Sequence, residues 1–179
     1  LPALLTFPEA VPVSYESVKS PSAHDVIGAP VHLYHEKIDP AWIDQNDHVG
    51  VTGYAKAMLR ASGGALRYTR LGFKDGLSEG RSVYALKWAT TYLREIRAGA
   101  TVEYKFQLLD FSDKLIHYAI FMRNRDEDYV AAVGESLDVH ILTATRRSAV
   151  MPPDRMELLE RIWAVHKTLP MPEECATAI

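Results

Sequence analysis

Hydrophobic and polar residues recur with regular spacing over most of the chain from residue 31 onward. In one stretch, apolar and small side chains return every three or four positions and form a single continuous face: Tyr54, Ala57, Met58, Ala61, Ala65 and Tyr68. This spacing predicts one long helix. We expect Thr52 to be its N-cap, and we expect it to end at Leu71-Gly72, where glycine suits the C′ position.

The segments on either side of this helix favour strands. Apolar and polar residues alternate at 31–38, and β-branched and aromatic residues are frequent at 82–96, 101–109, 114–123 and 129–142. Short turns separate the later segments, which predicts an antiparallel meander. A second helix is expected at 152–169, with proline in its first turn. The order predicts an α+β fold in which a long helix packs on a sheet of about five strands.

The pattern also divides the chain into three parts. Residues 1–30 contain several prolines and show no helical or strand period, so we expect an irregular N-terminal arm. Residues 31–150 hold the expected sheet and long helix, and residues 151–179 hold the C-terminal helix and tail. The length of 179 residues and the 47% hydrophobic content are enough for one full core.

Composition narrows the classes of function. The net charge of −3 argues against a nucleic-acid-binding surface, which is normally basic. The longest apolar runs are too short for a membrane-spanning helix, and the N-terminal residues do not resemble a signal peptide. The single cysteine, Cys175, excludes an intrachain disulfide and fits a reducing compartment. We therefore expect a cytoplasmic protein with no nucleic-acid or membrane partner.

The polar loop before the long helix carries the candidate chemistry. Asp44, Asn46 and His48 occupy alternate positions there. Asp44 could act as a general base or orient the site, Asn46 could hold water or a carbonyl, and His48 could relay a proton. Backbone amides near Gly53 and Tyr54, at the start of the helix, could receive a developing negative charge. This arrangement suits attack of water on a carbonyl.

Simpler interpretations of this loop stay open. Asp and Asn are common in turns, so the segment could be an ordinary helix-capping turn with a structural His48. A calcium loop is excluded because Val49 and Ala55 stand where such a loop needs glycine and glutamate. His117 and His140 lie on expected strands without clean ligand spacing, so we expect no metal.

The same loop resembles the signature of the hot-dog-fold acyl thioesterases. Asp44-x-Asn46-x-His48-Val49, with Tyr54 six residues after His48, is similar to that signature. Residues 40–43 resemble the family's lead-in strand, and residues 91–99 resemble the segment that enters its central hairpin. The stretch from Glu135 to Arg147, followed by a Pro-Pro helix, is similar to bacterial thioesterases of carnitine and betaine metabolism. The resemblance covers about residues 31–170.

The resemblance implies a hot-dog domain that forms a homodimer or homotetramer with active sites at the subunit interface. It implies hydrolysis of a small or medium acyl-CoA at Asp44, Asn46 and His48. No metal or cofactor is implied, because CoA enters only as part of the substrate. The residues expected to bind the substrate are Trp42, Gly53, Tyr54 and Lys87.

Two departures from the family keep other functions open. Gly50-Val51 replaces the usual Asn-Asn, and Lys87 and Ala89 stand where related proteins are expected to have Glu and His. The loss of that acidic residue favours an alternative, a non-hydrolytic protein that binds acyl-CoA or another small molecule. A hot-dog enoyl-CoA hydratase is a second alternative, but its Asp and His lie five residues apart, whereas Asp44 and His48 lie four apart.

Overall fold

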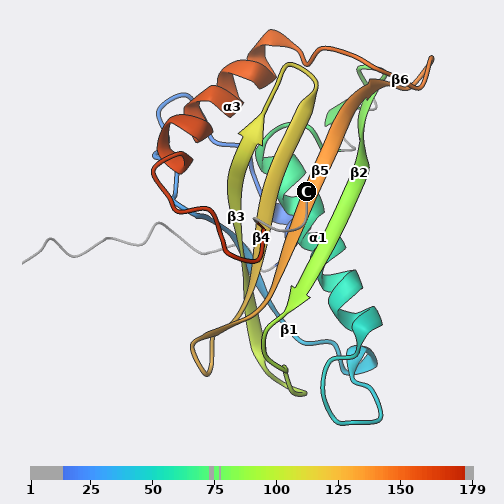
Figure 1. Ribbon diagram of the computed structural model, residues 1–179, viewed down its shortest axis with the longest axis vertical. Helices are drawn as coiled ribbons and strands as arrows, with labels where there is room; N and C mark the ends of the chain where they lie inside the picture. The colour runs from blue at the N-terminus through green and yellow to red at the C-terminus, as the bar shows by residue number, and fades with distance from the viewer. Residues whose placement is uncertain (1–13, 73–74, 77, 176–179) are drawn as a thin grey trace, which may run out of the picture.

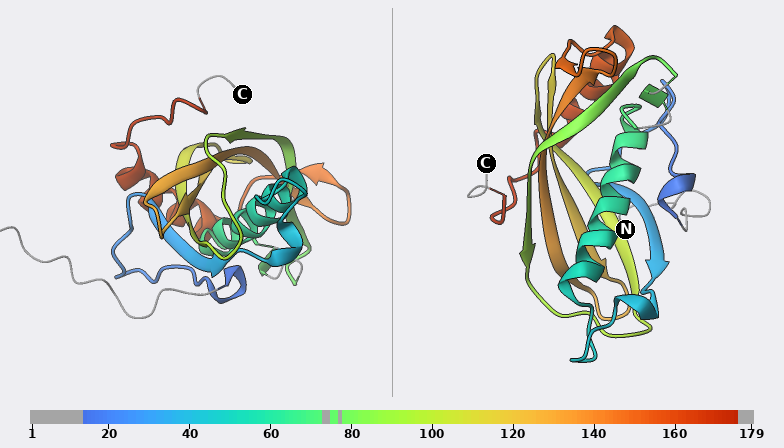
Figure 2. Two further views of the ribbon diagram at one scale, coloured as in Figure 1. Left: turned by 90° about the horizontal axis from the view of Figure 1, so that it is seen from below. Right: turned by 90° about the vertical axis from the view of Figure 1, so that its right-hand side faces the viewer.

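The computed structural model describes residues 14–72, 75–76 and 78–175. A long helix, α1 (Val51–Tyr68), lies along one face of a curled antiparallel sheet (Figures 1 and 2). The strands of this sheet are β1 (Val31–Lys37), β2 (Arg81–Tyr92), β3 (Thr101–Phe111), β4 (Leu115–Asn124), β5 (Tyr129–Leu142) and the short β6 (Arg147–Ser148). Helix α3 (Pro153–His166) follows the sheet and contacts β3. The predicted α+β architecture is confirmed.

The strands are arranged in the order β1-β3-β4-β5-β2, with β6 paired to β5. The predicted meander is therefore formed by β3, β4 and β5, while β2 returns to pair with β5 in the antiparallel sense. This topology leaves β1 and β2 at the two edges of the sheet. The loop that precedes α1 and the end of β2 lie at the same end of the molecule (Figure 1).

The core lies between α1 and the inner face of the sheet. Ala57, Met58 and Ala61 are fully buried on the helix, and the small alanines let it approach the sheet closely. The sheet contributes large buried side chains such as Tyr104 and Tyr118. Burying one large apolar side chain is worth about 1.5–3 kcal/mol, so this layer supplies much of the stability.

The helix boundaries differ from those predicted. Helix α1 begins after Gly50, not Thr52, because the Tyr54 N–H already donates to the Gly50 carbonyl at 3.0 Å. It ends at Tyr68 rather than Leu71, because Arg70 has a φ of 59° and the Leu71 N–H donates back to the Leu66 carbonyl at 2.8 Å, outside the regular helical ladder. Local hydrogen bonds override the sequence signals at both ends.

Two predicted strand segments also differ. Residues 40–42 form a short 3₁₀ helix rather than a lead-in strand, because the Asp39 carboxylate caps it by accepting from the Ala41 N–H at 2.9 Å. Strand β2 ends at Tyr92 rather than at 96. The N–H groups of both Leu93 and Arg94 donate to the Ala131 carbonyl, so the ladder stops and the chain turns away.

The two ends of the chain pack on opposite faces of the domain. In the described part of the N-terminal arm, Tyr15 contacts the middle of α1 near Gly63 and Gly64. The C-terminal tail lies on the outer face of the sheet, away from α1 (Figure 2). There the Gln107 side chain donates to the Pro170 carbonyl, and Cys175 is buried. Residues 1–13 of the predicted arm and 176–179 of the tail lie outside the described residues.

Within the described ranges, no helix combines the length and the apolar character needed to cross a membrane.

Candidate active site

The loop before α1 is a compact turn held by its own backbone. The Asp44 N–H donates to the His48 carbonyl at 2.9 Å, and Ile43 and Val49 form an antiparallel bridge. Asp47, between them, has a φ of 62°, in the left-handed region that Asp and Asn tolerate better than most residues. The turn therefore brings Asp44 and His48 next to one another.

The Asp44 carboxylate lies between His48 and the start of the helix. Its Oδ1 accepts from the Asn46 N–H at 2.8 Å and lies 3.7 Å from Nδ1 of His48. Both side chains are about one-third exposed, so water can reach them. A Cβ at Gly50 would lie 3.1 Å from the Asp44 Cβ, closer than most real contacts. The glycine that departs from the family pattern thus makes room for Asp44.

The start of α1 leaves backbone donors available beside this carboxylate. Gly50 is the N-cap, and no side chain makes a capping hydrogen bond there. The first three amides of a helix have no partner within it and carry the positive end of the helix dipole. A carbonyl oxygen placed against residues 51–53 would therefore be polarised.

A pocket of about 330 Å³ opens between this loop, the start of α1 and the end of β2. Its lining is mostly apolar and consists of His48, Val49, Val51, Tyr54, Tyr92, Leu93, Arg94 and Glu95. The rings of Tyr54 and Tyr92 meet edge to face, with their centroids 5.1 Å apart. Such a pocket suits a small organic group with one reactive polar end.

Tyr54 has a fixed position in this pocket. Its hydroxyl donates to the Arg94 carbonyl at 3.0 Å. Burial raises the pKa of Tyr54 to about 12, so the phenol keeps its proton at neutral pH. The hydroxyl thus ties α1 to the segment after β2, and the ring lines the pocket.

The segment after β2 is held against the loop by further hydrogen bonds. The Val49 N–H donates to the Ile96 carbonyl at 2.8 Å, and the Tyr129 hydroxyl donates to the Glu95 carbonyl at 2.6 Å. The Arg94 guanidinium lies 4.1 Å from the centroid of the Tyr129 ring. An adjoining hollow is lined by Arg94, Glu95, Arg97, Glu127 and Tyr129, so two arginines flank the apolar pocket.

The structure brings together some of the predicted site residues. Asp44, His48 and Tyr54 lie at the pocket or directly beside it. The Asn46 residue is exposed, and its recorded contact is the hydrogen bond from its backbone N–H to Asp44. Trp42 and Gly53 are buried against one another, where a Cβ on Gly53 would lie only 2.7 Å from the Trp42 Cβ, and neither lines the pocket. The roles assigned to these residues stay predictions.

Lys87 lies apart from this group within the single chain. It is exposed on β2, paired in register with Leu137, and does not line the pocket. Five residues of extended strand separate it from Tyr92, a distance of about 16 Å. Any contact between Lys87 and an Asp44 loop would therefore have to come from a second subunit.

Sequence reasoning did not identify Tyr92, Leu93, Arg94 and Glu95 as pocket residues. The sequence indicates the position of these four residues only indirectly. The segment resembles the family's approach to the central hairpin, but only the pairing of β2 with β5 places it beside α1.

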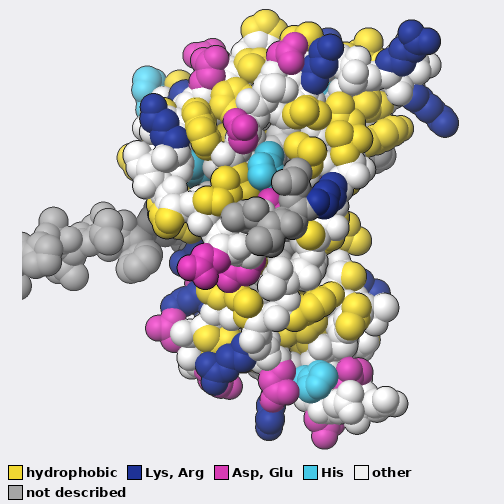
Figure 3. All heavy atoms as spheres, in the orientation of Figure 1, with side chains coloured by type: hydrophobic (Ala, Val, Ile, Leu, Met, Phe, Trp, Pro, Cys, Tyr) yellow, Lys and Arg dark blue, Asp and Glu magenta, His cyan; other side chains and the backbone are white. Residues whose placement is uncertain are grey.

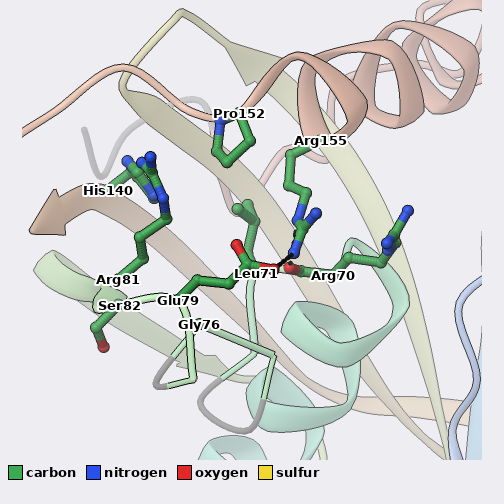
Figure 4. A pocket seen from close by; sticks show the side chains of 9 residues that line it. All are labelled: Arg70, Leu71, Gly76, Glu79, Arg81, Ser82, His140, Pro152 and Arg155. Carbon is green, nitrogen blue, oxygen red and sulfur yellow. Dashed lines mark hydrogen bonds and ion pairs between the residues drawn. The ribbon is translucent and has the colours of Figure 1, made fainter.

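A second pocket lies at the other end of α1 and is shown in Figure 4. The buried Arg155 donates to the Glu79 carboxylate at 2.6 Å and to the Arg70 carbonyl at 3.2 Å, and it also contacts Asp154. Its charge is thus matched by neighbouring groups. These contacts attach the start of α3 to the end of α1. Among the residues that the structure describes, no group of three or more His, Cys, Asp or Glu side chains could hold a metal ion.

A long helix held in a curled antiparallel sheet, with a polar loop at the helix start, defines a hot-dog domain. The family model for the thioesterase-like superfamily matches residues 38–162. The chain belongs to this superfamily, as the resemblance of its sequence predicted.

Curated relatives are similar over most of the chain. It is 26% identical over 142 residues to the betainyl-CoA thioesterase of Pseudomonas aeruginosa, covering 78% of this chain and 88% of that protein. It is 29% identical over 152 residues to an L-carnitine dehydrogenase/betainyl-CoA thioesterase of Agrobacterium fabrum, covering 84% of this chain. The match spans only 30% of the length of that longer relative.

Solved structures show the same fold at low sequence identity. A Staphylococcus aureus protein in complex with CoA has a TM-score of 0.76 at 19% identity, over 87% of this chain and 98% of its own. The DHNA-CoA thioesterase of Staphylococcus aureus has a TM-score of 0.68 at 16% identity, over 76% of this chain and 93% of its own.

Proposed function

We propose that the protein is an acyl-CoA thioesterase that hydrolyses small or medium acyl thioesters at the pocket between the Asp44 loop and the end of β2. The observation that carries this proposal is the position of the Asp44 carboxylate. It lies 3.7 Å from His48 and directly beside the uncapped start of α1. A base and a set of free amide donors therefore meet at the mouth of an apolar pocket.

The proposed reaction uses Asp44, His48, the amides at the start of α1 and one water molecule. Asp44 accepts a proton from water, and the water oxygen attacks the thioester carbonyl carbon. The amides at the start of α1 stabilise the negative charge that develops on the carbonyl oxygen. The C–S bond then breaks, and the CoA thiolate leaves and takes up the proton that Asp44 removed from water, which His48, 3.7 Å from Asp44, is placed to relay. The products are a carboxylic acid and free CoA. No cofactor enters this scheme.

Arginine side chains beside the pocket offer contacts to the phosphates of a CoA ester, although Glu95 and Glu127 line the same hollow and Arg97 pairs with Glu95 at 3.1 Å. Arg94 and Arg97 lie beside the hollow that adjoins the apolar pocket. Arginine binds phosphate oxygens well because its planar fork offers two parallel N–H donors. We therefore expect these two side chains to contact the phosphates of CoA while the acyl group enters the apolar pocket.

We also propose that the chain works as a homodimer joined through the β2 edge. Strand β2 is long, lies at the edge of the sheet and exposes Tyr84 and Leu86, and Leu59 is exposed on α1. Hydrophobic side chains also gather over β2 in Figure 3. A long apolar edge strand tends to pair with another strand. The C-terminal tail covers part of the outer face, which favours a dimer over the homotetramer that the family also allows.

The decisive experiment measures free-thiol release from a panel of acyl-CoAs. The panel includes betainyl-CoA, because two relatives carry that name. We expect turnover on at least one small acyl-CoA and its loss in Asp44→Asn. Saturable CoA-ester binding with no turnover on any member would instead support the non-hydrolytic binding protein.

Sedimentation analysis tests the assembly separately. A dimer that Leu86→Lys converts to monomers is expected, whereas a tetramer would contradict this part of the proposal. A cytoplasmic location stays a prediction from the single cysteine.

A further inference from the structure

We propose that Tyr129 is a positioning residue that holds the Arg94 guanidinium ready to bind a phosphate of the thiol carrier. Tyr129 lines the hollow beside the apolar pocket but not the pocket itself. Its role rests on the proposed function, because the apolar pocket is taken as the acyl site and the hollow as the space for the carrier.

The hollow continues the apolar pocket toward the start of β5. Arg94 and Glu95 line both spaces, so the two adjoin at these residues. In an acyl thioester the carrier extends beyond the sulfur atom, and a hollow next to the acyl site is open to it. The volume of the hollow is about 320 Å³, enough for one polar group of the carrier and its surrounding water.

Arg94 is fixed along its backbone and at the face of its side chain. Its N–H donates to the Ala131 carbonyl at 3.1 Å, and its carbonyl accepts from the Tyr54 hydroxyl at 3.0 Å. The guanidinium lies 4.1 Å from the centroid of the Tyr129 ring, which places it on the hollow side. A guanidinium stacked on a ring keeps the N–H donors at its edge free for another acceptor.

The Tyr129 ring is itself held in place at its hydroxyl. The hydroxyl donates to the Glu95 carbonyl at 2.6 Å and accepts from Nδ2 of Asn124 at 3.0 Å. Oδ1 of Asn124 accepts from the N–H groups of Asp126 and Glu127 at 2.9 and 3.2 Å, so the orientation of the amide is fixed as well. The ring is therefore a rigid support for the guanidinium.

The two arginines of the hollow differ in their partners. Arg97 forms an ion pair with Glu95 at 3.1 Å. Within the described part of the chain, Arg94 makes no ion pair, and its recorded side-chain contact is the stack on Tyr129. A phosphate would therefore meet a free fork of donors at Arg94, whereas Arg97 would first have to leave Glu95. Glu127 also lines the hollow, and its negative charge opposes an anion there.

The test places one small acyl group on three carriers, CoA, phosphopantetheine and pantetheine, of which only the last has no phosphate. The readout is kcat/KM on each phosphate-bearing ester divided by kcat/KM on the pantetheine ester. In Arg94→Ala, both ratios should fall by about tenfold, because a hydrogen bond to a charged group is lost. The loss should arise from a higher KM with kcat unchanged. Tyr129→Leu should lower both ratios by about threefold, since a cation–π contact is weaker.

Three further variants separate the ring, the charge and the fold. Tyr129→Phe keeps the ring under the guanidinium, so both ratios should stay within about twofold of wild type, although stability should fall. Glu127→Gln should raise both ratios by about twofold, because an exposed negative charge is removed. Arg125→Ala is the matched control, since the Arg125 guanidinium lies 3.9 Å from Glu103, outside the hollow, and both ratios should be unchanged.

Several outcomes would overturn the proposal. Equal losses on all three esters in Arg94→Ala would do so, as would a loss confined to the CoA ester, which would place the contact at a phosphate further along the carrier. Equal ratios in Tyr129→Phe and Tyr129→Leu would exclude a role for the ring. Arg94 and Glu127 are exposed, so their variants keep the test valid where Tyr129→Leu does not fold.

The failure of the proposed hydrolysis would be distinguishable. If wild type releases no thiol from any ester, the hydrolysis is wrong. The Kd of free CoA relative to that of pantetheine, measured by calorimetric titration on the same variants, would still test the phosphate contact. An unchanged Kd ratio in Arg94→Ala would overturn it.

Discussion

Two pairs of histidine and carboxylate side chains in this protein differ in every respect that matters for catalysis. On the outer face of the sheet, Nε2 of His117 lies 2.8 Å from Oε1 of Glu135, and the glutamate is only 2% exposed. At the start of α1, His48 and Asp44 lie 3.7 Å apart, and both are about one-third exposed. The pair with the shorter contact is therefore the one whose carboxylate is buried.

The surroundings of the two pairs explain the difference. The C-terminal tail buries Cys175 among Leu109, Ala119 and Val133, on the same face as Glu135. Burial, together with the nearby Glu135 carboxylate, raises the pKa of the Cys175 thiol to about 12, so the thiol stays protonated. The Asp44 pair instead lies beside an open pocket and free backbone donors. Access to substrate, rather than a short hydrogen bond, distinguishes a reaction site from a structural contact.

The largest expected effect compares the two carboxylates directly. Asp44→Asn removes the proposed base without changing the shape of the side chain, so kcat/KM for thiol release should fall by about 100-fold or more. Glu135→Gln, the matched amide substitution, should change kcat/KM by less than about threefold, because Glu135 lies on the outer face. Equal losses in both variants, with native circular dichroism, would show that the two pairs cannot be separated in this way.

A second prediction concerns the support under the Asp44 loop. Gly53→Ala would place a Cβ 2.7 Å from Trp42 and 2.8 Å from Val49, so the loop or the helix must shift. We expect a loss of about 1–3 kcal/mol in the free energy of unfolding and a fall in turnover. Gly63→Ala is the control, since its Cβ would meet only Tyr15 at 3.5 Å. It should stabilise the protein by about 0.5–1 kcal/mol. Urea titrations measure both, and a neutral Gly53→Ala would contradict the described packing.

The third prediction replaces the histidine of each pair with alanine, in separate variants. His117→Ala leaves the buried Glu135 without its recorded side-chain partner, and the second oxygen, Oε2, already lacks a hydrogen bond among the described residues. The free energy of unfolding should fall by about 1–3 kcal/mol, with little change in turnover. His48→Ala should have the opposite profile, with stability within about 0.5 kcal/mol of wild type and reduced turnover. Denaturation and thiol-release measurements on the same samples would show whether the profiles are reversed as expected.

The smallest effect is a dependence of stability on pH that arises from buried histidines outside the two pairs. Burial lowers the pKa of His166, whose Nδ1 accepts from the Leu108 N–H and whose Nε2 lies 2.7 Å from the Gly28 carbonyl. Burial also lowers the pKa of His32 and His140. Because the folded pKa values lie below about 6.5, the unfolded chain takes up protons first as pH falls.

Stability should thus be fully present above about pH 6.5 and decline below it, with Tm lower by a few degrees at pH 5. His166→Gln can keep both hydrogen bonds without titrating, so it should flatten the decline. A steeper decline in His166→Gln than in wild type would contradict this account.

The sequence predicted the elements better than it predicted their ends. The apolar face of α1 and the alternation in the strands depend on periodicity, which the chain itself carries, and both were confirmed. Thr52 was the wrong N-cap and Leu71 the wrong helix end, because the hydrogen bond from Tyr54 to Gly50 starts the helix earlier and the left-handed backbone of Arg70 ends it earlier. Periodicity does not encode the backbone conformation of single residues at the helix ends.

The residues of the candidate site also fall into two groups, those that the sequence predicted and those that only the structure identified. The sequence by itself determined the Asp44 loop, its position before a helix and the resemblance to the family, because the motif from Asp44 to Tyr54 is local in the chain. Only the tertiary structure decided that Tyr92 to Glu95 complete the pocket and that Lys87 does not line it. The physical reason is that β2 reaches α1 through its pairing with β5, more than forty residues away in the chain. Contacts across a sheet depend on register, and register is fixed only when the whole sheet has formed.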